Sequence, residues 1–347
     1  MGRSNSEAAL HTEMERSWWR CSAVGLANVW HCSITEAHDT QLTCMTASRI
    51  DLGERSMKSS VLFIVVAVSH LALAAESADE RDENLQARGA AQMPHLEALT
   101  KQVNGEVTYL DVGGRLAFVL RPQGKELSSP VPWLWYAPTI RGDIGAQPRP
   151  PHAWMFRRFL EKGIVIAGVD VGESMGNPEG RAGYVAFHKL LTEKHGFAQR
   201  AILMPQSRGG LMLYNWAAEN PDHVACVAGI YTVCDMSNWP GLKRAGVAYE
   251  MTENELAAVL PKHNPIDRLE PLAKAGIPIL HIHGDRDKPA PVERHAGELA
   301  KRYRKLGGNV ELILVVGKGH EVVPEFFERQ EVVDFVIRHS RPSGKKL

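Results

Sequence analysis

From residue 105 onward, short apolar segments alternate with segments of helical period, and this alternation constrains the fold more than any other feature of the chain. Residues 164–171 (IVIAGVDV) form a nearly continuous apolar run, as expected of a strand buried on both faces of a parallel sheet. Similar runs predict further strands over residues 131–137, 201–204, 224–231, 277–282 and 310–316. Strands alternating with helices indicate an α/β fold with a mostly parallel, doubly wound sheet.

The elements around these strands complete the predicted domain, residues 105–340. Residues 106–112 and 115–121 flank Gly113-Gly114, which predicts an antiparallel hairpin at one sheet edge. Helices are predicted within residues 154–163, 181–195, 208–220, 296–303 and 323–338. Residues 232–276 contain one predicted short helix, 253–260, and are expected to form a small cap-like insertion over the carboxyl ends of the strands.

Composition narrows the class of protein. Of 347 residues, 44% are hydrophobic and 23% charged, which is ordinary for a soluble globular protein and excludes wholesale disorder. Forty Lys and Arg balance forty Asp and Glu, so no basic field exists to bind nucleic acid. Three of the five cysteines lie in the first fifty residues, and Cys226 and Cys234, separated along a strand, are expected to be free thiols.

The first 56 residues show no useful periodicity and are predicted to be an unstructured extension. A zinc site built from Cys21, Cys32, Cys44 and a nearby histidine is the alternative, although no metal-binding spacing such as C-x-x-C is present. We expect residues 1–56 to be an upstream translation artefact, with Met57 as the true start of the protein.

Residues 57–75 have the grammar of a secretory signal peptide. Lys58 provides a positive charge, residues 61–75 are largely apolar, and Ala72-Leu73-Ala74 matches the small-x-small cleavage pattern. A bilayer requires roughly twenty residues, so the fifteen here predict no stable span in the mature protein. We therefore expect a secreted or periplasmic protein, with 76–104 as a linker and N-terminal segment; a short buried helix or an uncleaved anchor is the alternative.

A serine occupies the junction between a predicted strand and the helix that follows it, in the sequence Pro205-Gln206-Ser207-Arg208-Gly209-Gly210. A nucleophile on such a sharp turn needs small neighbours two residues away, and the backbone amides of the turn then face a developing oxyanion. Gly209 meets this requirement, whereas Pro205 stands where glycine is usual.

Two later loops supply the residues that would activate this serine. HGDRDKPAPV, residues 283–292, and GKGH, residues 317–320, each follow a predicted strand. Together with PQSRGG they make the chain resemble an α/β-hydrolase over about residues 105–340, and most of all the secreted esterase and prolyl-oligopeptidase-like branch.

The resemblance implies a catalytic triad that needs no metal or organic cofactor. Ser207 would be the nucleophile, His320 the general base and then acid, and Asp287 the carboxylate that orients His320. Asp285 is the rival acid, and the HG-x-x-D spacing of the family favours Asp287.

The oxyanion hole is expected to combine the N–H of Arg208 with one N–H from the loop after strand 131–137. That loop reads YAPTI rather than the familiar HG or HGGG, and Pro138 has no N–H, so Thr139 or Ala137 is the candidate. The Arg208 side chain is expected to be solvated. In the alternative, by similarity to the Ser-Arg pair of glucuronoyl esterases, its guanidinium lies near the oxyanion.

The remaining polar and aromatic candidates are given structural roles. Glu173 is expected to cap its loop, with substrate contact or a second acid as alternatives. His281 and His283 are expected to be structural, and His295 to lie on the surface. The side chains of the insertion that could line an acyl pocket or simply form a small core are Trp239, Tyr249 and Met251.

The sequence therefore predicts a secreted serine hydrolase that cleaves a carboxylic ester through an acyl-enzyme. Its partner would be a small-molecule ester, with a carbohydrate-linked ester as one alternative. The alternatives are a small-peptide peptidase of prolyl oligopeptidase type and a non-catalytic binding protein with the same fold.

Overall fold

The computed structural model describes residues 80–340, and the predictions made for residues 1–56, including the zinc alternative, and for the signal peptide at 57–75 lie outside them. Eight strands form one mixed sheet in the order β1-β2-β4-β3-β5-β6-β7-β8. The strands are β1 (Gly105–Val112), β2 (Arg115–Pro122), β3 (Trp133–Ala137), β4 (Val165–Val169), β5 (Ala201–Pro205), β6 (Val224–Ile230), β7 (Ile279–Gly284) and β8 (Val310–Val315).

The pairing of these strands matches the predicted doubly wound sheet. β1 and β2 form the antiparallel hairpin around Gly113-Gly114, and β2 is antiparallel to β4. Every later pair, from β3–β4 to β7–β8, is parallel. The carboxyl ends of the parallel strands therefore lie at one end of the sheet, and the loops that carry the predicted site begin there.

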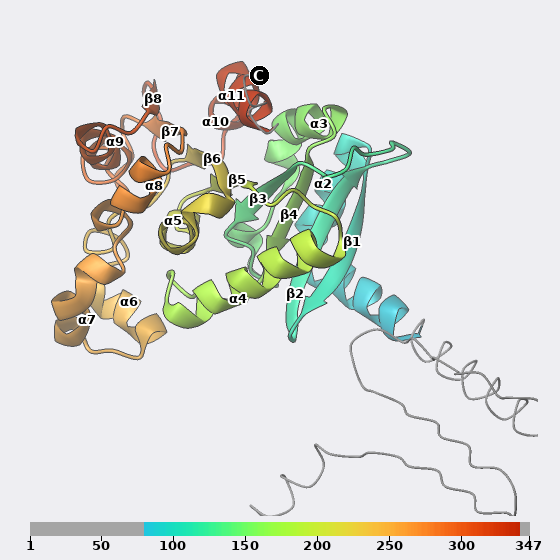
Figure 1. Cartoon of the computed structure of the whole chain (residues 1–347), viewed down its shortest axis with the longest axis horizontal. Helices are drawn as coiled ribbons and strands as arrows, with labels where there is room; N and C mark the ends of the chain where they lie inside the picture. The colour runs from blue at the N-terminus through green and yellow to red at the C-terminus, as the bar shows by residue number, and fades with distance from the viewer. Residues whose placement is uncertain (1–79, 341–347) are drawn as a thin grey trace, which may run out of the picture. The chain divides into compact units, whose positions relative to one another are not determined.

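Helices cover both faces of the sheet, with α3 and α11 on one side and α4 and α5 on the other (Figure 1). The first face packs α2 (Pro94–Val103), α3 (Ala153–Glu161), α10 (Pro324–Phe327) and α11 (Gln330–His339). The second packs α4 (Pro178–Lys189), α5 (Gly209–Glu219), α8 (Glu270–Lys274) and α9 (Ala296–Lys305). The predicted single helix over residues 323–338 is divided into α10 and α11, because Glu328 and Arg329 leave helical geometry.

The short turns of 3₁₀ or π geometry are η1 (Ile144–Ala146), η2 (Pro150–His152), η3 (Leu190–Lys194), η4 (Pro221–His223), η5 (Leu260–Lys262) and η6 (Pro265–Asp267). None of the helices within residues 80–340 is both long enough and apolar enough to cross a membrane.

Within the predicted linker and N-terminal segment, residues 76–104, the described residues 80–104 are largely helical. Residues 80–92 form a helix, which the non-helical Met93 separates from α2. The Gln86 amide accepts from the backbone N–H of Tyr109 at 2.8 Å and donates to its carbonyl at 2.9 Å. Gly89 packs directly on the Tyr109 ring. This segment therefore pairs with the exposed edge of β1 and belongs to the domain.

The insertion contains more helix than the sequence predicted. α6 (Leu242–Tyr249) precedes α7 (Glu253–Val259), whose start is fixed by a capping box between Thr252 and Glu255. A separate apolar cluster holds this region to the start of α5 and to the loop after β4; its members include Met175, Leu211, Val233, Met236, Ala245, Tyr249 and Leu256.

Candidate active site

Ser207 lies on a strained turn between β5 and α5. Its φ angle is +50°, in the left-handed region that non-glycine residues rarely occupy. A Cβ atom on Gly209 would lie 2.1 Å from the Ala137 carbonyl oxygen, and one on Gly210 would lie 2.2 Å from that of Val233. Both positions must be glycine because neighbouring backbone approaches them closely. The turn places the serine at the carboxyl end of β5.

The structure brings the three predicted triad residues together. Ser207 Oγ lies 2.7 Å from His320 Nε2, and His320 Nδ1 lies 2.7 Å from Asp287 Oδ2. Ser207 follows β5, Asp287 follows β7 and His320 follows β8. With Nδ1 donating to the carboxylate, Nε2 is left as the acceptor for the serine proton, which is the tautomer a general base requires.

The Asp287 carboxylate is built to stay ionised. Its side chain has no exposed surface, and it accepts from His320, from the backbone N–H of Ala290 at 2.8 Å and from His283 Nε2 at 3.2 Å. Burial alone would raise the pKa of Asp287, but the hydrogen bonds from His283 and His320 outweigh it and hold this pKa below its usual range.

Asp285, the rival acid, contacts the histidine loop by another route. Its Oδ1 accepts the backbone N–H of Gly317 at 2.6 Å, and the N–H of Arg286 donates to the Lys318 carbonyl at 2.9 Å. The loop that carries Asp287 and the loop that carries His320 are therefore joined by their backbones. The structure places Asp287, and not Asp285, against the imidazole.

Two backbone amides that the sequence assigns to the oxyanion hole donate no hydrogen bond within the described residues, whereas those of their neighbours do. Gln206 and Ile140 donate their N–H groups to the carbonyls of Ala137 and Ala146. Within the part of the chain that the structure describes, no acceptor faces the N–H of Arg208 or of Thr139. Thr139 is buried, and a buried N–H group is nearly always paired, so its free N–H is consistent with the predicted role of donating to a ligand oxygen. Arg208 and Thr139 remain the predicted pair.

Beneath the nucleophile lies a buried polar network that sequence reasoning missed. The Gln206 amide oxygen accepts from Tyr136 Oη at 2.8 Å and from His152 Nε2 at 2.7 Å, and its nitrogen donates to Tyr231 Oη. The Tyr231 ring lies 4.7 Å from the His320 ring. Burial lowers the pKa of His152 to about 4, so this histidine is neutral at physiological pH. The network fixes the residue that precedes Ser207.

The Arg208 side chain is not solvated, contrary to the sequence-based expectation. It is 17% exposed, and its guanidinium pairs with Glu173 at 2.8 Å and with Asp143. Glu173 therefore does not simply cap its own loop but connects that loop to the nucleophile turn. Burial raises the pKa of Glu173, and the charge of Arg208 opposes the rise.

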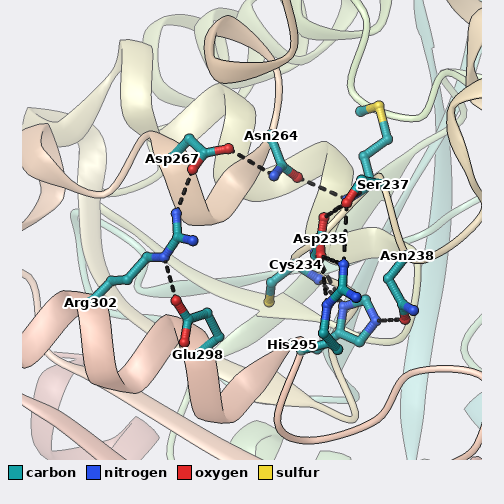
Figure 2. Close-up of polar contacts among 11 residues, drawn as sticks. Cys234, Asp235, Ser237, Asn238, Asn264, Asp267, His295, Glu298 and Arg302 are labelled. Atoms are coloured by element: carbon teal, nitrogen blue, oxygen red, sulfur yellow. Dashed lines mark hydrogen bonds and ion pairs between the residues drawn. The ribbon is translucent and has the colours of Figure 1, made fainter. Parts of the chain in front are cut away.

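His295 is buried, so its predicted surface position is wrong. Figure 2 shows it against the loop after β6, where Nδ1 accepts the N–H groups of Cys234 at 3.0 Å and Asp235 at 3.1 Å. Nε2 donates to Asn238 Oδ1 at 2.8 Å. This histidine joins the loop that carries Asp287 to the insertion, a contact between segments about 60 residues apart that no local pattern could reveal.

The other candidates have the structural roles that the sequence indicated. His281 and His283 are buried on β7, and Nε2 of His281 lies 2.7 Å from the Tyr214 hydroxyl. Cys226 and Cys234 are buried free thiols. Tyr249 lies in the core of the insertion, and its hydroxyl donates to the Met175 carbonyl at 3.2 Å. Among the described residues, no group of three or more His, Cys, Asp and Glu side chains could hold a metal ion.

Solved structures with similar folds include both peptidases and esterases. Porphyromonas gingivalis dipeptidyl peptidase 4 is 13% identical with a TM-score of 0.56, and the match covers 68% of this chain but 35% of that one. A truncated carbohydrate esterase from gut microbiota is 15% identical with a TM-score of 0.54, covering 69% of this chain and 98% of the other. The S-formylglutathione hydrolase FrmB from Staphylococcus aureus is 11% identical with a TM-score of 0.53, covering 67% and 99%.

The likeness to these structures shows that the chain has an α/β-hydrolase fold, and within this fold Ser207, His320 and Asp287 have the arrangement of a Ser-His-Asp triad. Residues 183–339 of the chain match the prolyl oligopeptidase family. The chain spans about a third of the length of the dipeptidyl peptidase that it resembles. No curated protein sequence matches it.

Proposed function

We propose that the protein is a secreted esterase that hydrolyses a carboxylic ester through an acyl-enzyme. The observation that carries the proposal is the continuous hydrogen-bonded chain from Ser207 through His320 to Asp287, with both contacts at 2.7 Å. A serine hydroxyl becomes a useful nucleophile only when an oriented base removes its proton, and this hydrogen-bonded chain supplies that base.

In the proposed reaction, Ser207 Oγ attacks the ester carbonyl carbon while His320 Nε2 takes its proton. The carbonyl oxygen becomes an oxyanion that the N–H groups of Arg208 and Thr139 stabilise. The tetrahedral intermediate expels the alkoxide, which leaves as the alcohol with the proton from His320. Water then attacks the acyl-enzyme with His320 again as base, and the acid and free Ser207 are released. Asp287 stays ionised throughout and stabilises the imidazolium.

The match to two hydrolases over nearly their whole length supports an ester substrate. The match extends over 98% of the carbohydrate esterase and 99% of the S-formylglutathione hydrolase. A small-peptide peptidase is the second candidate, and the match of residues 183–339 to the prolyl oligopeptidase family favours it. Secretion rests on the signal-like sequence at residues 57–75.

A fluorophosphonate probe, followed by a substrate panel, tests the proposal. We expect the probe to label the wild-type protein and not Ser207→Ala, and ester turnover by Ser207→Ala to fall by about 10³-fold or more. The panel compares p-nitrophenyl esters, acetylated sugars and proline peptides. Faster turnover of the peptides than of every ester would favour the peptidase, and a folded wild-type protein that takes no label would refute a serine enzyme.

A further inference from the structure

Arg149 lies near the catalytic residues without a counter-ion. It belongs to the loop between β3 and α3, and its Nε atom is buried without a hydrogen-bond partner. Within residues 80–340, no carboxylate pairs with its guanidinium. A partly buried charge that lacks a partner costs free energy in the folded protein, and an anion bound to the guanidinium would offset that cost.

Contacts of the Arg149 backbone place it next to the nucleophile turn. Its N–H donates to His152 Nδ1 at 3.2 Å, and His152 Nε2 donates to Gln206 Oε1 at 2.7 Å. Gln206 directly precedes Ser207. Two hydrogen bonds, both made by His152, therefore connect the Arg149 backbone to the turn that carries the predicted nucleophile.

The charge of the guanidinium reaches the hydroxyl groups around that turn. Burial raises the pKa of Tyr136 and of Tyr231, and the positive charge of Arg149 opposes the rise at both. Both hydroxyls contact Gln206, and the Tyr231 ring lies 4.7 Å from His320. The guanidinium therefore lies within electrostatic reach of the groups that surround the reacting atoms.

A second arginine at the same site provides the contrast. Arg208 also acts on the pKa of Tyr136, but Glu173 and Asp143 neutralise it. Asp143 is on the same loop as Arg149, yet it pairs with Arg208. Within residues 80–340, carboxylates therefore pair with Arg208, and none pairs with Arg149. A planar guanidinium fits a carboxylate best, because it donates two parallel hydrogen bonds.

We propose that Arg149 binds a carboxylate carried by the substrate, so that the protein prefers anionic esters to neutral ones. This inference rests on the proposed ester hydrolysis and adds a substrate class to it. The carboxylate can be on the acyl side or on the alcohol side of the scissile ester, and the two sources are separated by experiment.

The test compares kcat/KM for two matched substrate pairs. On the acyl side, mono-p-nitrophenyl glutarate is compared with its methyl ester; on the alcohol side, 4-acetoxybenzoate is compared with methyl 4-acetoxybenzoate. We expect wild-type protein to prefer the anionic member of one pair by about tenfold or more, the scale of a charge-assisted hydrogen-bonded pair. Arg149→Gln is expected to abolish this preference and to leave the neutral member within about threefold.

Arg157→Gln is the matched control. Arg157 lies on α3, and its replacement by glutamine removes the same unit of charge. Among the described residues, the Arg157 side chain donates only to the Gln102 carbonyl, at 2.8 Å on the surface. We expect it to retain the wild-type preference. Equal loss of both members of a pair in Arg149→Gln, or loss of the preference in Arg157→Gln, would overturn the proposal.

A thermal-shift measurement shows whether the Arg149→Gln substitution affects anion binding or folding. Because Arg149 makes no ion pair within the described residues, Arg149→Gln is expected to have the Tm of wild type or a higher one. Glutarate should raise the Tm of Ser207→Ala and not that of Ser207→Ala/Arg149→Gln. Wild-type turnover of neutral esters without any anion preference would sink this inference alone, whereas absence of turnover and of probe labelling would sink the proposed function itself.

Discussion

Asp285 and Asp287 carry the same side chain two residues apart, and their surroundings give them different roles. The Asp287 carboxylate is enclosed and accepts from His320, His283 and the Ala290 N–H. Asp285 is exposed and accepts one backbone N–H, that of Gly317. Only an enclosed carboxylate with a fixed position can hold an imidazole in one tautomer.

Replacing each aspartate with asparagine separates these roles. Asp287→Asn should lower ester turnover by orders of magnitude, because the amide favours the wrong imidazole tautomer. Asp285→Asn should cost far less than Asp287→Asn, because the amide oxygen can still accept from Gly317. Steady-state rates with one chromogenic ester decide the assignment. A more damaged Asp285→Asn enzyme would move the acid to Asp285.

The residues whose positions the sequence predicts correctly are placed by the order of the strands, whereas those that it misplaces are held by side-chain contacts. Ser207, Asp287 and His320 follow successive predicted strands, and parallel strands bring such positions to one edge whatever the side-chain packing. His295 and Arg208 are held by partners tens of residues away, at Cys234 and at Asp143. Periodicity carries no information about such contacts, so both were wrongly expected to face solvent.

At the scale of elements, the turn between β5 and α5 depends on the absence of side chains. Gly209→Ala should reduce activity by about tenfold or more and also destabilise the fold, because its Cβ would meet the Ala137 carbonyl oxygen at 2.1 Å. Moving Ala137 would displace the loop that carries Thr139. Ester turnover and thermal unfolding of the variant measure both effects.

The control for this substitution is Gly113→Ala in the β1–β2 hairpin. Gly113 has a φ of +62° and open space around its Cβ position, so alanine there is strained but meets no neighbour. We expect a loss of about 1 kcal/mol in stability and unchanged turnover. If Gly209→Ala proved as active as Gly113→Ala, the close approach would not matter for catalysis.

Elements with a strong apolar pattern were predicted well, and those stabilised by single contacts were not. β4 and β7 are buried along their whole length, and their sequences show it. The helix at residues 80–92 contacts β1 through the Gln86 amide and packs Leu85 and Ala90 partly against the core. In α6 few residues are buried, among them Ala245 and Tyr249. Neither segment has a long periodic pattern, so the sequence predicts a linker and N-terminal segment for the first and loop for the second.

For the molecule as a whole, three buried histidines are expected to contribute to the variation of stability with pH. Burial lowers the pKa of His152 and of His295 to about 4 and that of His281 to about 3. In the unfolded chain each binds a proton below about pH 6.5, whereas in the folded protein each remains neutral to lower pH. Their favourable effect is therefore complete above pH 6.5 and is lost as the pH falls toward 4.

We expect the free energy of unfolding to decrease steeply between pH 6.5 and pH 4.5. Each of these histidines contributes at most about 1.4 kcal/mol per pH unit, the value for one proton taken up on unfolding. The lowered pKa of Asp287 adds little here, because its contribution is lost only near and below the pKa of an unfolded aspartate. Urea unfolding at several pH values measures the slope. His295→Gln, whose amide oxygen can still accept from Cys234, should reduce the slope by one proton's share; an unchanged slope would mean that His295 is protonated in the folded protein.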